Sequence, residues 1–287
     1  MPDSFSPRPL RDILAGDQCL TASSAFDPMS ARIAHSLGFE VGVMGGSVAS
    51  YAVLGAPDLI LLTMTELVEQ ARRVCRATPL RLIVDADHGY GNALNVMRTV
   101  QELQAAGVAG ITIEDTLLPR AFGSSAAPQL VSVDEGVGKM KAALKGRGQG
   151  DALVFGRTSA ASITGVEDAI RRLRAYEAAG VDALFVPGLK RRDEVDRIAE
   201  AVKLPLILGG GGDDIAEPSY LASRGVRVWL WGHQPFAAAV KALVDTMTAV
   251  RDGAAPGALA AAAPESLLKH YTWAAEYDAF TKDFLGG

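Results

Sequence analysis

Two aspartates, Asp85 and Asp87, stand at the end of a short apolar run and are followed by a glycine-rich turn. On a strand, residues two positions apart point to the same face, so both carboxylates would face the same side. Two like charges this close repel each other unless a cation lies between them or solvent screens them. Mg²⁺ and Mn²⁺ prefer hard oxygen ligands and often take only one or two protein carboxylates. The pair therefore predicts a divalent metal site, with a solvated strand end and its turn as the alternative.

Other apolar runs along the chain also end in groups that can do chemistry. Gly46 and Ser47 follow one run, Glu114 and Arg157 end two more, and His233 follows the last. An apolar strand has no structural need to end so regularly in charged or hydroxyl groups. The regularity favours a functional site over a set of unrelated solvated strand ends.

The composition excludes several classes of protein. The chain has 287 residues, of which 49% are hydrophobic and 21% charged, and its formal net charge is -5, so we expect a soluble protein without a nucleic-acid partner. Two cysteines, Cys19 and Cys75, predict no disulfide framework and fit a reducing compartment. We see neither a signal peptide nor an apolar run of the roughly 18 residues that a membrane span needs. The expectation is a cytoplasmic protein with no membrane partner.

Short apolar runs alternate with stretches of helical period up to about residue 250, which indicates βαβ units and a parallel sheet. The expected strands are residues 19–25, 40–45, 80–85, 110–115, 152–157, 183–187, 205–209 and 227–232. Several of the expected helices (30–37, 65–76, 93–106, 133–144, 166–179 and 192–202) end at a glycine, which is a C-cap signal. Eight units in about 250 residues predict a (β/α)₈ TIM barrel, whose reactive groups lie at the C-terminal ends of the strands. A doubly wound sheet is the competitor, but residues 25–28 lack its usual glycine-rich first turn.

The C-terminal region predicts helices beyond the barrel. An alanine-rich helix is expected over residues 235–250, then a linker over 252–264 and a final helix over 265–284. The predicted domains are thus a catalytic barrel, residues 1–250, and a linker with a helical extension, residues 251–287. The apolar stripe of the last helix must be buried, either on its own barrel or on a neighbouring subunit. The flexible composition of the linker makes exchange between subunits plausible.

Five short motifs occur in order along the chain: residues 26–32 (FDPMSAR), 45–47 (GGS), 85–92 (DADHGYGN), 113–115 (IED) and 136–139 (GVGK). Together they resemble the isocitrate lyase/phosphoenolpyruvate mutase superfamily over residues 18–250. Residues 114–119 (EDTLLP), 122–123 (FG) and 232–233 (GH) make the chain most similar to its oxaloacetate decarboxylase branch. The resemblance implies a Mg²⁺-dependent barrel whose eighth helix is exchanged between subunits, assembled as a homotetramer (a dimer of dimers).

The implied activity is decarboxylation of oxaloacetate, a small 2-oxo dicarboxylate, to pyruvate and CO₂ through a metal-stabilised enolate. Asp85 would hold Mg²⁺, with Mn²⁺ as the alternative ion, directly or through water, and Asp87 and Glu114 would be further ligands. No organic cofactor is expected.

Three further residues are assigned to the substrate. Arg157 would clamp a carboxylate with its guanidinium fork, the alternative being a structural ion pair at the barrel rim. Ser47, after Gly46, would bind the 2-oxo acid carboxylate through its hydroxyl and backbone N–H, the alternative being a turn serine. His233 would donate a hydrogen bond that orients the substrate, with proton donation to the enolate as a second possible role.

Departures from the family pattern keep other activities open. The loop over residues 119–125 lacks the cysteine and histidine of the carbon–carbon lyases, which disfavours isocitrate or methylisocitrate cleavage. Residues 209–212 are four glycines where the decarboxylase branch is expected to have a tyrosine, and Ser159 stands where it has Asn or Asp. A turn is the favoured interpretation of the glycines, ahead of a phosphate site. The rival functions are a lyase or hydrolase acting on another 2-oxo or 2-hydroxy diacid, and a binding protein that has lost turnover.

Overall fold

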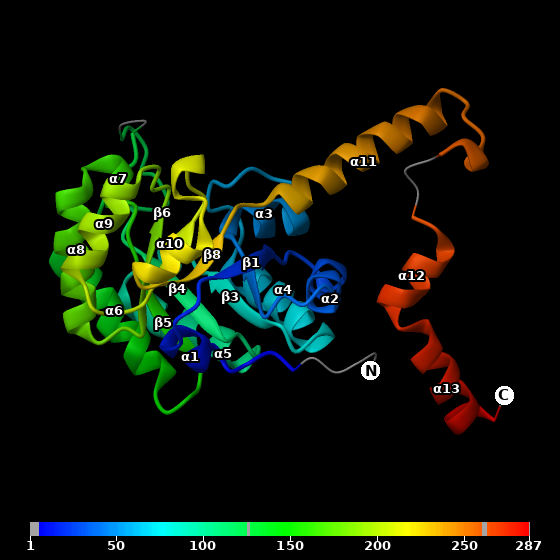
Figure 1. Ribbon diagram of the computed structural model, residues 1–287, viewed down its shortest axis with the longest axis horizontal. Helices are drawn as coiled ribbons and strands as arrows, with labels where there is room; N and C mark the ends of the chain where they lie inside the picture. Colours follow the sequence, from blue (N-terminus) through cyan, green and yellow to red (C-terminus); the bar gives the residue numbers. More distant parts are fainter. Residues whose placement is uncertain (1–5, 125–126, 260–262, 287) are drawn as a thin grey trace. The chain divides into compact units, whose positions relative to one another are not determined.

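The computed structural model describes residues 6–124, 127–259 and 263–286. Eight parallel strands close into a barrel in sequence order, with the first paired to the last (Figure 1). The strands are β1 (Leu20–Ser24), β2 (Val41–Met44), β3 (Arg81–Asp85), β4 (Gly110–Glu114), β5 (Leu153–Arg157), β6 (Ala183–Pro187), β7 (Leu206–Gly209) and β8 (Val226–Leu230). The predicted (β/α)₈ barrel is confirmed, and each expected strand lies within two residues of its observed bounds.

Helices follow the strands and cover the outside of the barrel (Figure 1). They are α2 (Pro28–Ser36), α3 (Gly46–Leu54), α4 (Met64–Ala77), α5 (Ala93–Ala105), α6 (Val133–Arg147), α7 (Ala160–Ile163), α8 (Val166–Ala179), α9 (Arg192–Ala201) and α10 (Pro218–Ser223), with α1 (Leu10–Ala15) before the first strand and a 3₁₀ turn, η1 (Asp213–Ile215), after β7. The sequence did not predict α1, α3, α7 or α10. Of these, α1, α7 and α10 have six residues or fewer, too few to show a period, and α3 is small and apolar on most faces.

The core has two layers, one inside the barrel and one between the strands and the helices. Alternate strand residues fill the interior, where Phe155 and Phe185 are the largest side chains. Helix α1 adds Leu10, Ile13 and Leu14 to this interior cluster. The barrel is therefore a packed core, and its loops at the C-terminal ends of the strands are what remains for a ligand.

Local signals explain where several helices begin and end. Asp27 and Ser30 form a capping box at the start of α2, and Thr63 and Glu66 form another at the start of α4. Three of the expected helices end at Gly38, Gly107 and Gly180, which all have positive φ, as does Gly225 after α10.

The chain divides into two compact units, Pro7–Gly232 and a second unit that holds the residues from His233 onward. The second unit contains α11 (Gln234–Arg251), η2 (Pro256–Ala258), α12 (Glu265–Thr272) and α13 (Ala274–Leu285). The single helix predicted over residues 265–284 is wrong, because Trp273 adopts a left-handed φ of 59° and separates two helices. The domain boundary predicted near residue 250 stays a prediction, as does exchange of the eighth helix.

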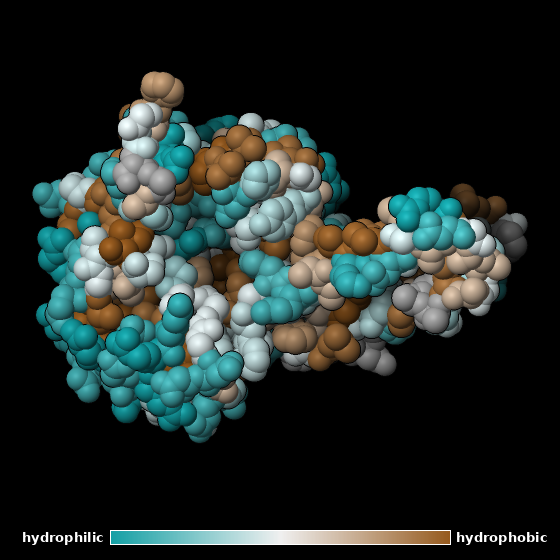
Figure 2. Space-filling view, turned by 90° about the horizontal axis from the view of Figure 1, so that it is seen from above, coloured by the Kyte–Doolittle hydropathy of each residue, from teal (hydrophilic) through white to brown (hydrophobic). Residues whose placement is uncertain are grey.

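Helix α11 has no buried residue, and Figure 2 shows brown apolar side chains among teal polar ones on the C-terminal unit. Among the helices of the described residues, none is both long enough and apolar enough to cross a bilayer.

Candidate active site

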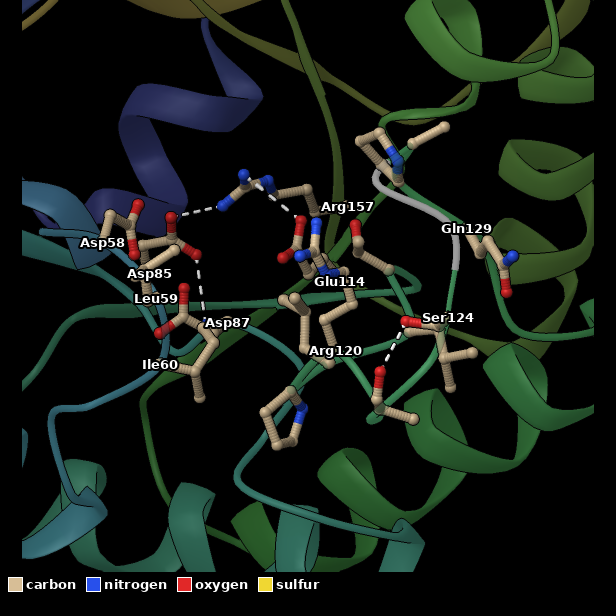
Figure 3. A pocket seen from close by; sticks show the side chains of 17 residues that line it. Asp58, Leu59, Ile60, Asp85, Asp87, Glu114, Arg120, Ser124, Gln129 and Arg157 are labelled. Atoms are coloured by element: carbon tan, nitrogen blue, oxygen red, sulfur yellow. Dashed lines mark hydrogen bonds and ion pairs between the residues drawn. The ribbon is translucent and has the colours of Figure 1, made fainter.

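Neighbouring strands bring the predicted carboxylates and arginine together at one end of the barrel. β3 ends at Asp85, β4 at Glu114 and β5 at Arg157, and the last two residues pair directly in the sheet. The Arg157 guanidinium contacts the Asp85 carboxylate, and its Nη2 lies 3.2 Å from Glu114 Oε2. Thr112 Oγ1 donates a hydrogen bond to Asp85 Oδ1 at 3.0 Å. Figure 3 shows the three charged side chains pointing toward one another.

Asp87 lies in the turn that follows β3 and is 8% exposed. Its φ is 48°, and its backbone N–H donates to Asp85 Oδ1 at 3.2 Å. Its carbonyl accepts from Glu114 N at 2.8 Å, which ties the turn to the neighbouring strand. A Cβ on Gly46 would lie 2.6 Å from Asp87 Oδ1, so only glycine lets the chain pass this close to the carboxylate.

The acidic groups carry more negative charge than Arg157 balances. Burial, followed by repulsion from Asp85, Glu114 and Asp58, raises the pKa of Asp87 well above its usual value. Burial would also raise the pKa of Asp85, but the charge and hydrogen bond of Arg157 outweigh it and lower that pKa. The pKa of Glu114 is raised, mainly by burial and against the pull of Arg157. A bound cation would relieve this repulsion.

These side chains line one cavity of about 540 Å³. Its walls come from three places: the ends of β3, β4 and β5, the segment between α3 and α4, and the loop between β4 and α6. The lining residues are Asp58, Leu59, Ile60, Asp85, Asp87, Glu114, Thr116, Leu117, Leu118, Pro119, Arg120, Ala121, Ser124, Ala127, Pro128, Gln129 and Arg157. The cavity is thus acidic at its base and largely apolar on its loop side (Figure 3).

Asp58 is a site residue that the sequence analysis missed. Its pKa is raised by burial and then by the charge of Asp85, which places it among the interacting carboxylates. It lies between α3 and α4 and not at a strand end. The sequence analysis selected charged residues at the ends of predicted strands, so it could not select Asp58. No pattern in the neighbouring sequence distinguishes this residue.

The remaining predicted residues lie outside this lining. Ser47 is the second residue of α3, is half-buried, and is not among the described side chains that line the cavity. His233 is the N-cap residue of α11 and belongs to the C-terminal unit. Asn92, the last residue of the motif over residues 85–92, caps α5 by accepting from Leu94 N and Asn95 N.

Backbone geometry explains the four glycines at the end of β7, residues 209–212. Gly210 and Gly211 have positive φ, and Trp229 Nε1 donates to the Gly210 carbonyl at 2.8 Å. A Cβ on Gly209 would lie 2.8 Å from the ring of Phe185. The interpretation as a turn therefore accounts for these residues without a phosphate.

The donor set fits a hard divalent cation bound by few direct protein ligands. Among the described residues, no group of three or more His, Cys, Asp or Glu is arranged to hold a metal by itself. Instead, Arg157 occupies part of the coordinating capacity of Asp85 and Glu114. Mg²⁺ commonly keeps several waters and takes one or two carboxylates, which is the ligand supply that these residues offer.

An acidic, arginine-bridged cavity at the C-terminal ends of barrel strands is where enzymes of this architecture place their active sites. The chain belongs to the phosphoenolpyruvate phosphomutase family, whose model matches residues 10–251. The predicted family is thereby confirmed.

Individual proteins of known name are similar to this chain in sequence or in structure. An oxaloacetate decarboxylase of Paraburkholderia xenovorans (strain LB400) is 54% identical over 280 residues, covering 98% of this chain and 94% of that protein. The structure of an oxaloacetate acetylhydrolase has a TM-score of 0.84 at 27% identity and covers 98% of both chains. That of a phosphonopyruvate hydrolase in complex with oxalate and Mg²⁺ has a TM-score of 0.84 at 28% identity, covering 98% of this chain and 100% of that one.

Proposed function

We propose that this protein is an oxaloacetate decarboxylase that releases pyruvate and CO₂ with the help of a divalent cation. The observation that carries the proposal is the 54% identity, over 98% of the chain, to a protein of that name. The acidic cavity supports it independently, because its charge and donor atoms suit a cation and its volume admits a four-carbon diacid.

Asp85, Asp87 and Glu114 would hold the cation, with Mg²⁺ as the expected ion and Mn²⁺ as a substitute. When bound, it would polarise the 2-oxo group and stabilise the negative charge left as CO₂ departs. Asp58 lies close enough to Asp85 to add to the negative charge that attracts the ion.

Arg157 orders the acidic end of the cavity and supplies positive charge toward a substrate carboxylate. Its guanidinium bridges Asp85 and Glu114, which holds the two strand-end carboxylates in a fixed relation. It lies 5.5 Å from the centre of the Phe185 ring, so an apolar, polarisable face supports it from one side. The planar fork leaves Arg157 able to present further N–H groups to an anionic substrate.

The roles of Ser47 and His233 rest on the sequence. Ser47 would bind the 2-oxo acid carboxylate at the N-terminus of α3, where Gly46 lets the backbone approach Asp87 closely. His233 would orient the substrate by donating a hydrogen bond. Replacement by Gln, which keeps a donor, should cost less in kcat than replacement by Ala if that role is right.

The nearest rival is hydrolytic or lyase cleavage of a carbon–carbon bond in a 2-oxo or 2-hydroxy diacid. The similarity to an oxaloacetate acetylhydrolase structure favours this alternative. Against it, the loop between β4 and α6 lines the cavity and has neither Cys nor His in residues 116–132. A lyase of the carbon–carbon type would draw its acid or base from that loop. A binding protein without turnover is the third candidate.

Product analysis separates these candidates. Purified enzyme is incubated with oxaloacetate and Mg²⁺ or Mn²⁺, and carbon-13 NMR follows the products above a metal-only background. We expect pyruvate and CO₂. Pyruvate formation above the metal-only background should be lost in EDTA and in the Asp85→Ala variant. Oxalate plus acetate would establish the hydrolase instead, and metal-dependent substrate binding without product would establish the binding protein. Alkylmalates in the same assay test the lyase.

We also propose a cytoplasmic homotetramer. Support comes from the two cysteines, which form no disulfide, and from the exposed apolar side chains of α11, which need a covering surface.

A further inference from the structure

The turn that carries Asp87 has an unusual backbone. Between β3 and α5, Asp87, Gly89, Tyr90 and Gly91 all have positive φ, and two of these four are not glycine. Left-handed backbone is unfavourable for residues with a Cβ, and it persists only where the surroundings hold it. Since Tyr90 is a bulky residue with a φ of 61°, the surroundings must hold the turn that carries Asp87.

Two side chains from neighbouring helices hold successive carbonyls of this turn. Lys139 Nζ, from α6, donates to the His88 carbonyl at 2.8 Å, and Thr99 Oγ1, from α5, donates to the Gly89 carbonyl at 3.1 Å. Both donors are nearly inaccessible, with Lys139 3% exposed and Thr99 1% exposed. Burying an ammonium is costly unless it is satisfied, and here its acceptor is the residue next to Asp87.

Close packing of α6 against its neighbouring helices places Lys139 next to the turn that carries Asp87. A Cβ on Gly136, one turn earlier in α6, would overlap the Tyr176 hydroxyl, so glycine lets α6 pack closely against α8. Helices α5 and α6 also pack along each other, which places Thr99 and Lys139 under the same turn. The motif over residues 136–139 therefore has a structural purpose that the proposed chemistry had left unexplained.

We propose that Lys139, with Thr99 beside it, is a positioning residue that fixes the turn so that the Asp87 carboxylate faces Asp85 and Glu114. The inference rests on the proposed metal site. Lys139 acts through the backbone of the turn and touches neither substrate nor cation. Losing its hydrogen bond frees the His88 carbonyl and lets the left-handed backbone at Asp87 relax.

The test is direct measurement of Mn²⁺ binding to metal-free protein by calorimetry, with the electron paramagnetic resonance signal of free Mn²⁺ as a second readout. We expect Lys139→Met, which keeps the length of the side chain without its donor, to bind Mn²⁺ at least tenfold more weakly. Lys141→Met is the matched control, because Lys141 is exposed on the same helix. It should bind like the wild type.

Thr99 provides a second pair of variants if Lys139→Met does not yield folded protein. Thr99→Val removes the hydroxyl donor at nearly constant volume, whereas Thr99→Ser keeps it. We expect two- to fivefold weaker Mn²⁺ binding for Val and wild-type binding for Ser. A purely structural role would lower the melting temperature of Thr99→Val while leaving Mn²⁺ affinity per folded molecule equal in the two variants.

The outcomes separate this inference from the proposed function. If Asp87→Asn weakens Mn²⁺ binding but folded Lys139→Met binds within twofold of wild type, the positioning role is overturned and the metal site stands. Should Lys139→Met be unobtainable, equal affinities of the two Thr99 variants overturn it in the same way. If the wild type binds no Mn²⁺, or Asp87→Asn binds it equally well, the metal site itself fails and the inference fails with it.

Discussion

Asp87 is the residue on which the acidic cluster imposes the greatest electrostatic cost. It is buried, it faces Asp85, Glu114 and Asp58, and its pKa is raised well above the usual value. An acid with a raised pKa in the folded state binds protons more tightly there than in the unfolded chain. The stability of the metal-free protein should therefore fall as pH rises from the unfolded value of about 4 toward the raised pKa.

Asp87→Asn should consequently stabilise the metal-free protein while it impairs catalysis. Asn removes the charge, and it tolerates the left-handed φ of 48° at this position. We expect the melting temperature in EDTA at pH 7.5 to rise by a few degrees and the gain to disappear toward pH 4. Activity should fall on the order of 10–100-fold. A lower melting temperature at pH 7.5 would contradict this account of the cluster.

Arg157→Lys tests whether the shape of the guanidinium matters beyond its charge. A lysine keeps one positive charge but cannot bridge Asp85 and Glu114 as a planar fork does. We expect kcat/KM for oxaloacetate at saturating metal to fall on the order of 10²-fold, measured by steady-state kinetics. Arg171→Lys, an exposed arginine on α8, serves as the control. Equal kinetics for the two variants would show that charge alone suffices.

At the scale of elements, a buried network of hydrogen bonds holds both ends of the loop between β4 and α6. Arg172 Nη1, from α8, donates to Asp115 Oδ2 at 3.1 Å and to the Val131 carbonyl at 2.9 Å. Tyr176 Oη donates to the same Asp115 oxygen at 2.7 Å. Asp115 is fully buried and adjoins Glu114, so the network couples one wall of the cavity to the sheet.

Arg172→Met should therefore be strongly destabilising, because it leaves the Asp115 carboxylate buried without its cation. We expect a loss of about 3–5 kcal/mol in the free energy of unfolding, measured by urea titration. Arg171→Met is a close control, since Arg171 also pairs with Asp168 but is exposed. It should cost less than about 1 kcal/mol. Similar losses in both variants would mean that burial of the network contributes little.

The sequence predicted what periodicity and strand-end chemistry encode. It located all eight strands and the acids at the ends of β3 and β4, since an apolar run that stops at a charge is a local pattern. It missed Asp58, which does not directly follow a strand, and the partnership of Arg172 with Asp115, which are 57 positions apart. The break at Trp273 was also missed, because the aromatic spacing continues across it. Contacts between distant segments depend on how the helices and strands pack, and the periodicity of hydrophobic residues within one segment carries no information about that packing.

At the scale of the whole molecule, α11 is unlike the helices that cover the barrel. None of its residues is buried, and five of its apolar side chains are 42–65% exposed. Val240, Leu243, Val244, Met247 and Val250 recur at the spacing of one helical face. A stripe of this kind marks a surface that another element or chain covers.

A second copy of this chain is the expected occupant of that stripe, in keeping with the exchange between subunits predicted from the linker. We expect light scattering coupled to size-exclusion chromatography to give a mass near four chains for the wild type. Leu243→Glu combined with Met247→Glu should yield smaller species with unchanged helical content by circular dichroism, because burying two carboxylates in an apolar contact is costly. Lys241→Ala, which removes an exposed charge from the same helix, should keep the wild-type mass. A monomeric wild type, or a double variant of wild-type mass, would show that α11 is covered in some other way.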